Sequence, residues 1–235
     1  MIELNNIEIG HKKCLFTIDS IELSKGKVYS LIGANGAGKT TFLQTLQGNQ
    51  QTLAGKVIID TTYITEFDRI RKAKTIAFVN SKFDGIDYLK VSEYVALGRT
   101  PYTNALGRLS TVDQEIIEHA LSELKIQHLA NFFTTQLSDG ERQLAAIARA
   151  ITQETAIIIL DEPTAFLDYA NRKLVMNEMK KIAIQFNKCI IISSHDLELC
   201  LESETDILVI DKLTKKLKHF TSNTLSKTEL IEIGF

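Results

Sequence analysis

The sequence predicts an α/β protein in which helices wrap a mainly parallel sheet. Short apolar runs typical of strands alternate with helical patterns along most of the 235 residues, which favours parallel strands joined by helices. A glycine-rich segment at residues 33–41 stands between one such run and a helix. From residue 84 to about residue 153 the pattern is helical throughout. A separate helical lobe is therefore expected within the alternating core.

Residues 1–79 are expected to be rich in strands. Two stretches near the start alternate apolar and polar side chains, which is typical of antiparallel strands with one face toward water. The next apolar run ends in the glycine-rich segment, and the helix that follows, residues 41–47, stops at Gly48. Two more strands come after it, with a charged connection between them. The expected strands are residues 2–4, 15–21, 28–32, 55–60 and 75–79.

The rest of the chain is expected to be helical first and then to alternate. Apolar residues at three- and four-residue spacing predict helices in the lobe over residues 91–97, 111–124 and 140–152. Beyond the lobe, the expected strands are residues 156–160, 189–192, 207–210 and 217–220, and the expected helices are residues 172–185 and 197–201. We expect one domain, residues 1–235, whose core and antiparallel part comprise residues 1–81 and 154–235, with a helical subdomain at about residues 82–153.

Composition and charge exclude several classes of protein. A chain of 235 residues with 44% hydrophobic content can bury a sizeable core. Lysine and arginine total 27 against 29 acids, so no overall field favours nucleic acid as a partner. The three cysteines are odd in number and widely spaced, which fits buried thiols in a reducing compartment. Because no signal-peptide pattern and no long apolar run is visible, we expect a soluble, cytoplasmic protein.

The glycine-rich segment is predicted to bind phosphate. Gly33, Gly38, Lys39 and Thr40 have the G-x-x-x-x-G-K-[ST] spacing between a strand and a helix. Glycine allows backbone angles that turn successive N–H groups onto a phosphate. Lys39 can reach the outer phosphates, and the Thr40 hydroxyl is placed to ligate Mg²⁺. The alternative is a glycine-rich turn with an incidental lysine. The candidate nucleotide-binding residues are Gly33, Ala34, Asn35, Gly36, Ala37, Gly38, Lys39, Thr40 and Thr41.

Three polar side chains follow two other buried strands. Asp161 and Glu162 end the apolar run 156–160, and His195 follows the run 189–192 after two serines. The carboxyl ends of parallel strands meet at the edge where ligands bind in open α/β sheets. Asp161 would hold Mg²⁺, directly or through water, and Glu162 could accept a proton from the attacking water or orient it. His195 is expected near the γ-phosphate, although solvated strand ends and a structural histidine are the alternatives.

Residues 137–143, Leu-Ser-Asp-Gly-Glu-Arg-Gln, resemble the signature sequence of the ATP-binding-cassette (ABC) ATPases, and residues 163–168 resemble the loop that crosses the dimer interface in that family. The motifs follow the family order over essentially the whole chain. The resemblance implies a P-loop NTPase (RecA-like) core with an antiparallel β subdomain and an inserted helical subdomain, and Mg²⁺-dependent ATP hydrolysis. It also implies a head-to-tail homodimer, in which Ser138 and Gly140 contact the γ-phosphate of ATP held by the other subunit.

The chain departs from the family pattern at four positions. Asp139 replaces a glycine, and Glu141 replaces a glutamine in the signature. Ser81 stands where a glutamine usually touches Mg²⁺ or water, so it is a further candidate metal ligand. Ile9 aligns with the aromatic residue that stacks on adenine, and it could offer only apolar contact. The expected hydrolytic set is unchanged and consists of Lys39, Thr40, Asp161, Glu162 and His195.

Residues 95–102, Val-Ala-Leu-Gly-Arg-Thr-Pro-Tyr, resemble a segment of the ATPase subunits of iron-siderophore, haem and cobalamin importers, although a glycine cap and a proline turn would also explain them. This resemblance implies a peripheral subunit at the inner face of the cell membrane, bound to integral-membrane permease subunits, with ATP as substrate and Mg²⁺ as cofactor. A groove for the permease is expected at residues 88–102, with Leu89, Tyr94 and Tyr102 as apolar anchors. Two alternatives stay open: a soluble ABC ATPase acting in assembly, repair or translation, and a kinase or other phosphate-loop enzyme.

Overall fold

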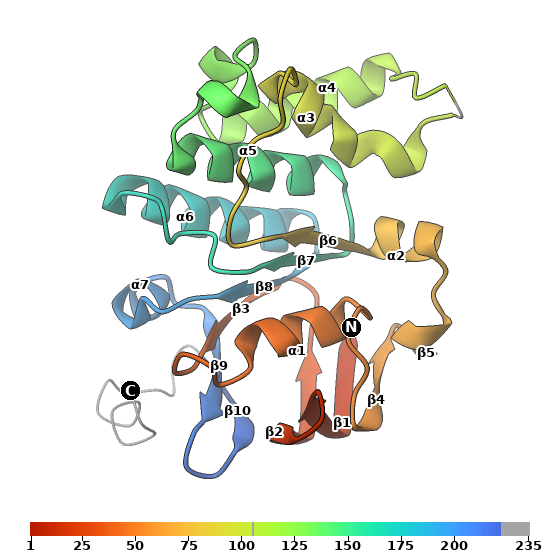
Figure 1. The fold of residues 1–235 in the computed structure, drawn as a ribbon, viewed down its shortest axis with the longest axis vertical. Helices are drawn as coiled ribbons and strands as arrows, with labels where there is room; N and C mark the ends of the chain where they lie inside the picture. Colours follow the sequence, from red (N-terminus) through yellow and green to blue (C-terminus); the bar gives the residue numbers. More distant parts are fainter. Residues whose placement is uncertain (105, 222–235) are drawn as a thin grey trace.

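The computed structural model describes residues 1–104 and 106–221, and residues 222–235, which we assigned to the core, lie outside the described ranges. Within those ranges, ten strands form one sheet in the order β5-β4-β1-β2-β10-β9-β3-β8-β7-β6. Five neighbouring strands pair in parallel (Figure 1). They are β9 (Asp206–Asp211), β3 (Lys27–Ile32), β8 (Cys189–Ser193), β7 (Ile157–Leu160) and β6 (Ile76–Val79). The predicted α/β fold with a parallel core is confirmed.

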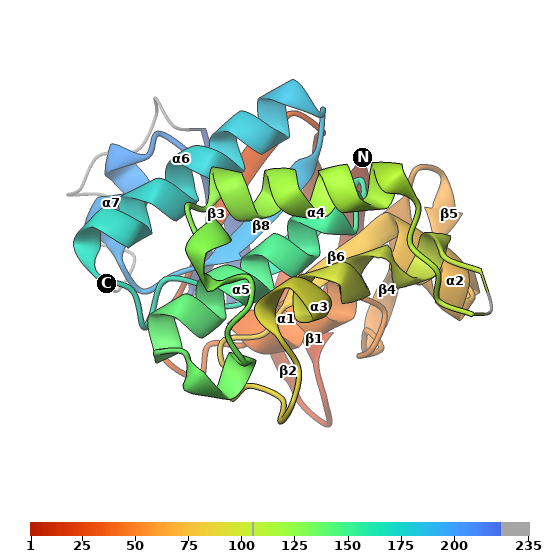
Figure 2. The same ribbon diagram turned by 90° about the horizontal axis from the view of Figure 1, so that it is seen from above.

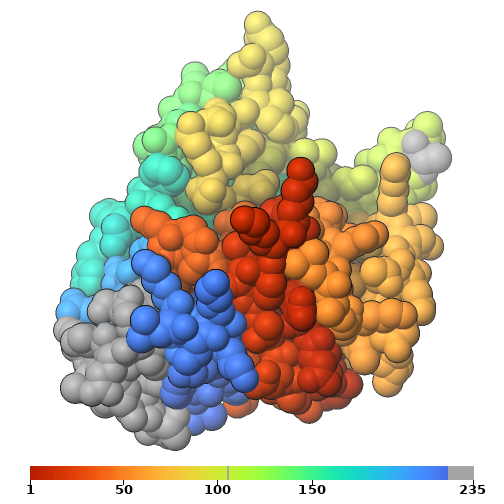
Figure 3. Space-filling view, turned by 60° about the horizontal axis from the view of Figure 1, so that its bottom comes forward, coloured from red at the N-terminus to blue at the C-terminus, as the bar shows by residue number. Residues whose placement is uncertain are grey.

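The other strands form a largely antiparallel extension of the sheet. They are β1 (Ile2–Gly10), β2 (Cys14–Leu23), β4 (Ala54–Ile59), β5 (Thr62–Tyr63) and β10 (Lys216–Phe220). Figure 3 shows the N-terminal strands in red beside the blue segment that contains β10, and β10 pairs with β2. β1 continues past the polar residues Asn5 and Asn6, because Asn6 adopts a left-handed φ of 51° and pairing with β2 resumes at Ile7. The first strand is therefore longer than predicted.

Helices connect these strands. The α-helices of the described residues are α1 (Lys39–Leu46), α2 (Arg69–Thr75), α3 (Val91–Ala96), α4 (Thr111–Glu123), α5 (Asp139–Thr152), α6 (Tyr169–Gln185) and α7 (Leu197–Glu202). Short 3₁₀ turns span Ile64–Glu66, Leu97–Tyr102, Gln127–Leu129 and Thr134–Gln136. α2 occupies the connection that was predicted only to be charged, and Asp68 caps it by accepting from the N–H of Arg71 at 2.7 Å. None of its residues is buried, so it lacks the apolar periodicity that would have revealed it.

The parallel strands lie between two layers (Figures 1 and 2). Helices α5 and α6 cover one face, where Ile158 and Leu160 of β7 pack, and α3 and α4 pack on the far side of α5 (Figure 1). Helix α1 and the antiparallel strands cover the other face, where Ile157 and Ile159 pack. Because both faces are covered, every side chain of β7 is buried. This double burial explains the continuous apolar runs in the sequence.

The carboxyl ends of β3, β6, β7 and β8 meet at one edge of the sheet. Leu31 pairs with Ser193, and Leu160 pairs with both Ile192 and Val79, so the four strands end at the same level. The side chains that follow these strands are thereby brought to one edge, at residues 33–38, 80–81, 161–162 and 194–195.

The segment Leu97–Tyr102 packs against the end of α5. A Cβ atom on Gly98 would lie 2.2 Å from Thr152 Oγ1, so this close approach requires glycine. The side chain of Arg99 is buried and donates hydrogen bonds to Asp113 Oδ1 at 2.7 Å and to the carbonyl oxygen of Thr152 at 2.8 Å. The glycine and the arginine of this segment therefore have structural roles inside the helical part of the molecule.

We expect Asp113→Asn to destabilise the protein by about 2 kcal/mol at neutral pH, because it removes one of the carboxylates that pair with the buried Arg99 guanidinium and leaves Glu154. Hydrogen bonds from Ser110, and then the Arg99 guanidinium, lower the pKa of Asp113 from its ordinary value of 3.8 to about 2. Because the pKa of Asp113 is lower in the folded state than in the unfolded state, the charged carboxylate stabilises the protein at pH values above the unfolded-state pKa. This stabilisation is lost as the pH falls through the folded-state pKa. The difference in the free energy of unfolding between wild type and variant, measured with urea, should therefore decrease as the pH is lowered from about 4 to about 2.

Glu118→Gln is the control for this experiment, because it removes an exposed acid from the same helix, α4. It should change the free energy of unfolding by less than about 0.5 kcal/mol at either pH. Equal losses in the two variants, or a gap that does not change with pH, would contradict the role given to Asp113.

Candidate nucleotide site

The predicted phosphate-binding segment joins β3 to α1. Gly36 and Gly38 have left-handed backbone angles, with φ of 74° and 105°, which a residue with a Cβ atom rarely takes. Gly38 is also the N-cap of α1, so the first N–H groups of that helix face the loop. Lys39 is 6% exposed, and its Nζ donates to the carbonyl oxygen of Gly33 at 2.8 Å. The Lys39 side chain therefore reaches across the loop from its last residues to its first.

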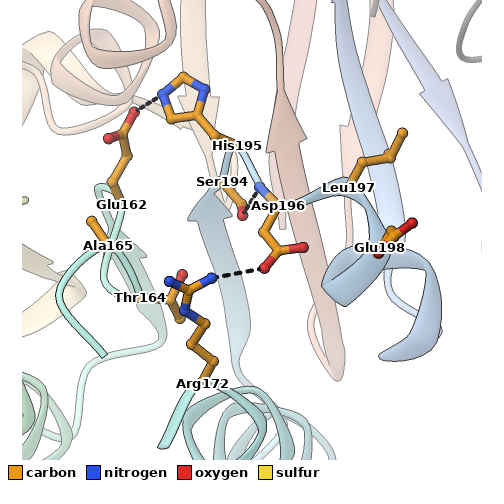
Figure 4. A pocket seen from close by; sticks show the side chains of 9 residues that line it. All are labelled: Glu162, Thr164, Ala165, Arg172, Ser194, His195, Asp196, Leu197 and Glu198. Carbon is orange, nitrogen blue, oxygen red and sulfur yellow. Dashed lines mark hydrogen bonds and ion pairs between the residues drawn. The ribbon is translucent and has the colours of Figure 1, made fainter. Parts of the chain in front are cut away.

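Lys39 also meets the residues at the ends of β7 and β8. Its Nζ lies 3.3 Å from His195 Nε2 and 3.9 Å from Glu162 Oε1. His195 Nε2 in turn contacts Glu162 Oε1, as Figure 4 shows. Burial lowers the pKa of Lys39, and the carboxylates of Glu162 and Asp161 oppose this shift. The structure therefore brings Lys39, Glu162 and His195, which come from three parts of the sequence, into mutual contact.

Asp161, at the end of β7, is 6% exposed and uses its two oxygens differently. Its Oδ2 accepts a hydrogen bond from Thr40 Oγ1 at 2.9 Å, and its Oδ1 accepts one from Ser193 Oγ at 2.6 Å. Ser81 is half-buried and lies two residues beyond β6, whose Val79 carbonyl accepts from the N–H of Asp161 at 2.9 Å. Thr40 and Asp161 are thus in contact, and Ser81 lies on the adjoining segment.

Ser193 was not among the residues singled out from the sequence. It is fully buried, and its hydroxyl accepts a hydrogen bond from the N–H of Glu162 at 2.7 Å in addition to donating to Asp161. The sequence signal was weak, because Ser193 reads as the end of the apolar strand Cys-Ile-Ile-Ile-Ser. A hydroxyl in a strand that is otherwise cysteine and isoleucine was the one available clue.

Ser138 and Gly140 lie at the start of α5, in the helical layer on the opposite face of the parallel strands from α1 (Figure 1). Ser138 caps α5: its Oγ donates to Glu141 Oε2 at 2.7 Å and accepts from the Glu141 N–H at 3.3 Å. The Ser138 hydroxyl and the Ser138 N–H both donate to the Glu141 carboxylate, and these two bonds lower its pKa. Asp139 forms an ion pair with Arg142 at 2.5 Å. The two unusual acids of the signature segment are thus engaged within α5, away from the loop of their own chain.

The expectation for Ile9 was wrong. Its side chain is fully buried and packs in the core of the antiparallel strands and α1, so it offers no surface to an adenine ring. β-sheet pairing places Ile9 opposite Phe16. The neighbouring Leu15 is half-buried and, with Ile210, lines a hollow of about 170 Å³ beside the phosphate loop. Strand register decides which face of a sheet a side chain lies on, and here it directs Ile9 into the core and away from the site.

A cavity of about 490 Å³ opens beside Glu162 and His195 (Figure 4). Its wall includes the ion pair between Arg172 and Asp196, whose atoms are 3.1 Å apart. Ser194 Oγ accepts a hydrogen bond from the N–H of Asp196 at 3.0 Å, which fixes the chain just after His195. Glu162 lines this cavity and its side chain is 30% exposed, so water can reach it.

The fold and the site together define a P-loop NTPase. The class is characterised by a glycine loop before a helix, a lysine in that loop, and carboxylates at the same edge of a parallel sheet. This chain has all three, in Gly36 and Gly38, in Lys39, and in Asp161 and Glu162. Among the residues that the structure describes, none of the helices has the length and apolar character needed to cross a membrane.

Comparison with known proteins identifies the family. Residues 16–165 match the family model described as ABC transporter. The chain is 32% identical to the petrobactin import ATP-binding protein FpuC of Bacillus anthracis, over 90% of this chain and 78% of that protein. It is 31% identical to the molybdate import ATP-binding protein MolC of Haemophilus influenzae, over 92% of this chain and 80% of that protein. A solved structure reported as an inward-facing ABC transporter of the metal-chelate type superposes with a TM-score of 0.82 at 28% identity, over 99% of this chain and 88% of that one.

The chain therefore belongs to the ABC transporter family, and it is an ATP-binding and ATP-hydrolysing cassette of that family.

Proposed function

We propose that this chain is the ATPase subunit of an importer for iron-siderophore, haem or cobalamin-type complexes. The observation that carries the proposed site is the convergence of Lys39, Glu162 and His195 at one sheet edge, next to the contact between Thr40 and Asp161. The petrobactin-importing relative and the metal-chelate type structure support the cargo class. The molybdate-importing relative makes an oxyanion the competing cargo.

The hydrolytic roles follow from the contacts. Lys39 leaves the Gly33 carbonyl to bind the outer phosphates, with the N–H groups of residues 33–41 around them. Glu162 orients or deprotonates the attacking water, because its carboxylate borders the cavity beside Lys39. His195 lies against both side chains and contacts the γ-phosphate. Binding of ATP therefore exchanges bonds among these three side chains for bonds to phosphate.

We assign Mg²⁺ to Thr40 and Asp161, with Ser81 as a further ligand on the adjoining segment. Hydroxyl and carboxylate oxygens are the hard donors that Mg²⁺ prefers, and this cation usually takes few protein ligands together with phosphate oxygens and water. The residues fit this pattern: Thr40 and Asp161 are in contact, and in the described part of the chain no cluster of three or more His, Cys, Asp or Glu residues could hold a metal alone. Bound Mg²⁺ would neutralise charge on the phosphates.

Two copies of the chain bind head to tail in this proposal. Ser138 is exposed, and it lies in the layer across the parallel strands from α1 and its loop. A second copy could bring Ser138, Gly140 and the N-terminus of the 14-residue helix α5 to the γ-phosphate. On binding, the Ser138 hydroxyl would exchange its acceptor, Glu141, for a phosphate oxygen.

The helical subdomain, about residues 82–153, binds the permease subunits and so holds the cassette at the inner face of the membrane in this proposal. The exposed apolar side chains of this subdomain include Ile86, Tyr88, Leu97 and Tyr102. Two of the anchors expected from the sequence are corrected: Tyr94 is buried, and Leu89 packs against the core. We therefore take Tyr88 and Leu97 as anchors instead, in addition to Tyr102.

The double substitution Tyr88→Glu and Leu97→Glu should lower uptake of a ferric siderophore in cells by at least about tenfold, because it places charge in an apolar contact. ATPase activity of the purified variant should stay within about twofold of wild type, since both side chains lie on the surface. The matched control is Ile184→Glu, which changes an exposed apolar residue of α6 outside the helical subdomain. This control should leave uptake unchanged.

Parallel uptake measurements with haem, cobalamin and molybdate would identify the cargo. Normal uptake of all four substrates by the double variant, together with no membrane protein crosslinked to a photoreactive group at Tyr88, would favour the soluble ABC ATPase over the importer.

A further inference from the structure

Ser193 is a fully buried hydroxyl between the strands that carry the site. It ends β8, which lies between β3 and β7, and it pairs with Leu31 of β3. A buried hydroxyl is unfavourable unless it finds hydrogen-bond partners. Its partners here are Asp161 and Glu162. The Ser193 hydroxyl thus forms its hydrogen bonds with the two acidic residues of the ATPase site.

The serine hydroxyl fixes the orientation of the Asp161 carboxylate. A hydroxyl has one proton to donate, and Ser193 Oγ donates it to Asp161 Oδ1 at 2.6 Å. The other oxygen, Oδ2, is in contact with Thr40 Oγ1 at 2.9 Å. Because each oxygen has its own partner, the carboxylate is held against rotation, and Oδ2 is the oxygen presented to the phosphate loop.

The same oxygen of Ser193 fixes the backbone of Glu162. It accepts the Glu162 N–H at 2.7 Å, and Glu162 has a φ of 48°, in the left-handed region that is unfavourable for a residue with a Cβ atom. Consecutive side chains of a regular strand point to opposite faces. The left-handed turn lets both acids face the site, since Asp161 contacts Thr40 while Glu162 contacts His195.

We propose that Ser193 is a positioning residue for ATP hydrolysis. One buried hydroxyl holds the Asp161 carboxylate for the metal and the Glu162 backbone for the attacking water, and it ties both to the strand that leads to His195. This inference rests on the roles given above to Asp161 and Glu162. It is specific to the hydroxyl, because alanine or valine at this position would leave the Asp161 Oδ1 and the Glu162 N–H without this partner.

Ser193→Ala should lower kcat by about 10- to 100-fold, the usual effect of losing a partner behind a metal ligand. The KM for ATP in Mg²⁺ should rise by about fivefold, because the phosphate loop is intact but the Mg²⁺-dependent part of binding is weakened. Ser193→Cys keeps the shape of the side chain with a somewhat larger atom that hydrogen-bonds weakly, so its kcat should be intermediate. The matched control is Ser30→Ala, which removes another fully buried serine hydroxyl, from the adjacent strand β3, where it is 2.6 Å from Thr205 Oγ1. Its kcat should stay within about twofold of wild type.

A binding measurement gives a readout that does not depend on turnover. The wild-type protein should bind a fluorescent ATP analogue more tightly in Mg²⁺ than in EDTA. The ratio of these two affinities, the Mg²⁺ ratio, should be lower in Ser193→Ala by about fivefold or more. Binding in EDTA should be unchanged within about twofold, because Lys39 and the loop remain.

Folded Ser193→Ala and Ser193→Cys proteins with wild-type kcat and a wild-type Mg²⁺ ratio would overturn the proposal. Equal losses in Ser193→Ala and Ser30→Ala would also overturn it, since they would indicate a general packing effect. Absence of ATPase activity in the wild-type protein would instead contradict the hydrolytic roles in the proposed function, and the Mg²⁺ ratio would still decide the role of Ser193.

Discussion

Glu162→Gln is expected to lower kcat for ATP hydrolysis by about 100-fold or more, the range for loss of a general base. The amide has nearly the same shape as the carboxylate, but it can neither accept the proton of the attacking water nor orient that water in the same way. The affinity for ATP should stay within about threefold of the wild-type value, because Lys39 and Asp161 still hold the phosphates and the metal. Phosphate release measures the first effect, and equilibrium binding of labelled ATP measures the second.

Glu198→Gln provides a matched comparison, because Glu198 lines the same cavity as Glu162 without a role in the proposed site (Figure 4). Its kcat should remain within about twofold of wild type. Hydrolysis at the wild-type rate by Glu162→Gln would show that Glu162 is misassigned. Equal losses in the two variants would show that the cavity as a whole, and no single carboxylate, controls turnover.

Lys39→Ala is expected to weaken ATP binding by about 100-fold, since two charge-assisted hydrogen bonds of about 1.5 kcal/mol each account for that factor. The ammonium is buried and donates to the carbonyl oxygen of Gly33, and in the ATP complex it would contact the outer phosphates. Titration with a fluorescent ATP analogue measures the loss. Hydrolysis should fall with binding at any ATP concentration below saturation.

Lys72→Ala separates a phosphate role from a structural one. Lys72 Nζ donates to the carbonyl oxygen of Gly48 at 2.9 Å, just beyond the C-terminal end of α1. This contact resembles that of Lys39 with the Gly33 carbonyl, but it lies at the opposite end of the helix from the phosphate loop. Its ATP affinity should stay within about twofold of wild type. If both lysine variants bind ATP equally well, the phosphate-binding role of Lys39 is wrong.

The phosphate loop and the parallel core could be predicted because their signals are local. The left-handed angle at Gly38 and the buried Lys39 occur at two positions of a fixed spacing. The runs at β7 and β8 follow from burial on both faces. Such features depend on neighbours in the sequence, so the sequence alone was sufficient.

The features that were missed depend on packing between distant segments. Ile9 turns inward because of its register against β2, and Tyr94 is stacked on Phe83 with ring centroids 4.2 Å apart. Helix α2 forms with a capping Asp68 and without a buried face. Ser193 gains its role only when β7 lies beside β8. No periodicity or spacing in the sequence specifies these contacts.

The segment Leu97–Tyr102 shows how a motif can be informative for an unexpected reason. It resembled a segment of one importer group, and the structure gives Gly98 and Arg99 packing and ion-pair roles against α5 and Asp113. Leu97 and Tyr102 remain exposed. The same short segment can therefore stabilise the helical part and present apolar side chains to a partner.

The mass of the ATP-bound protein tests the shared site most directly. In excess ATP and Mg²⁺, Glu162→Gln should sediment as a dimer with one ATP per chain, because ATP is not consumed and is held between the loop of one copy and Ser138 of the other. Adding Ser138→Arg, which places a bulky side chain at the exposed start of α5, should return the protein to monomers that still bind ATP. A Glu162→Gln protein that remains monomeric with ATP bound would contradict the head-to-tail arrangement.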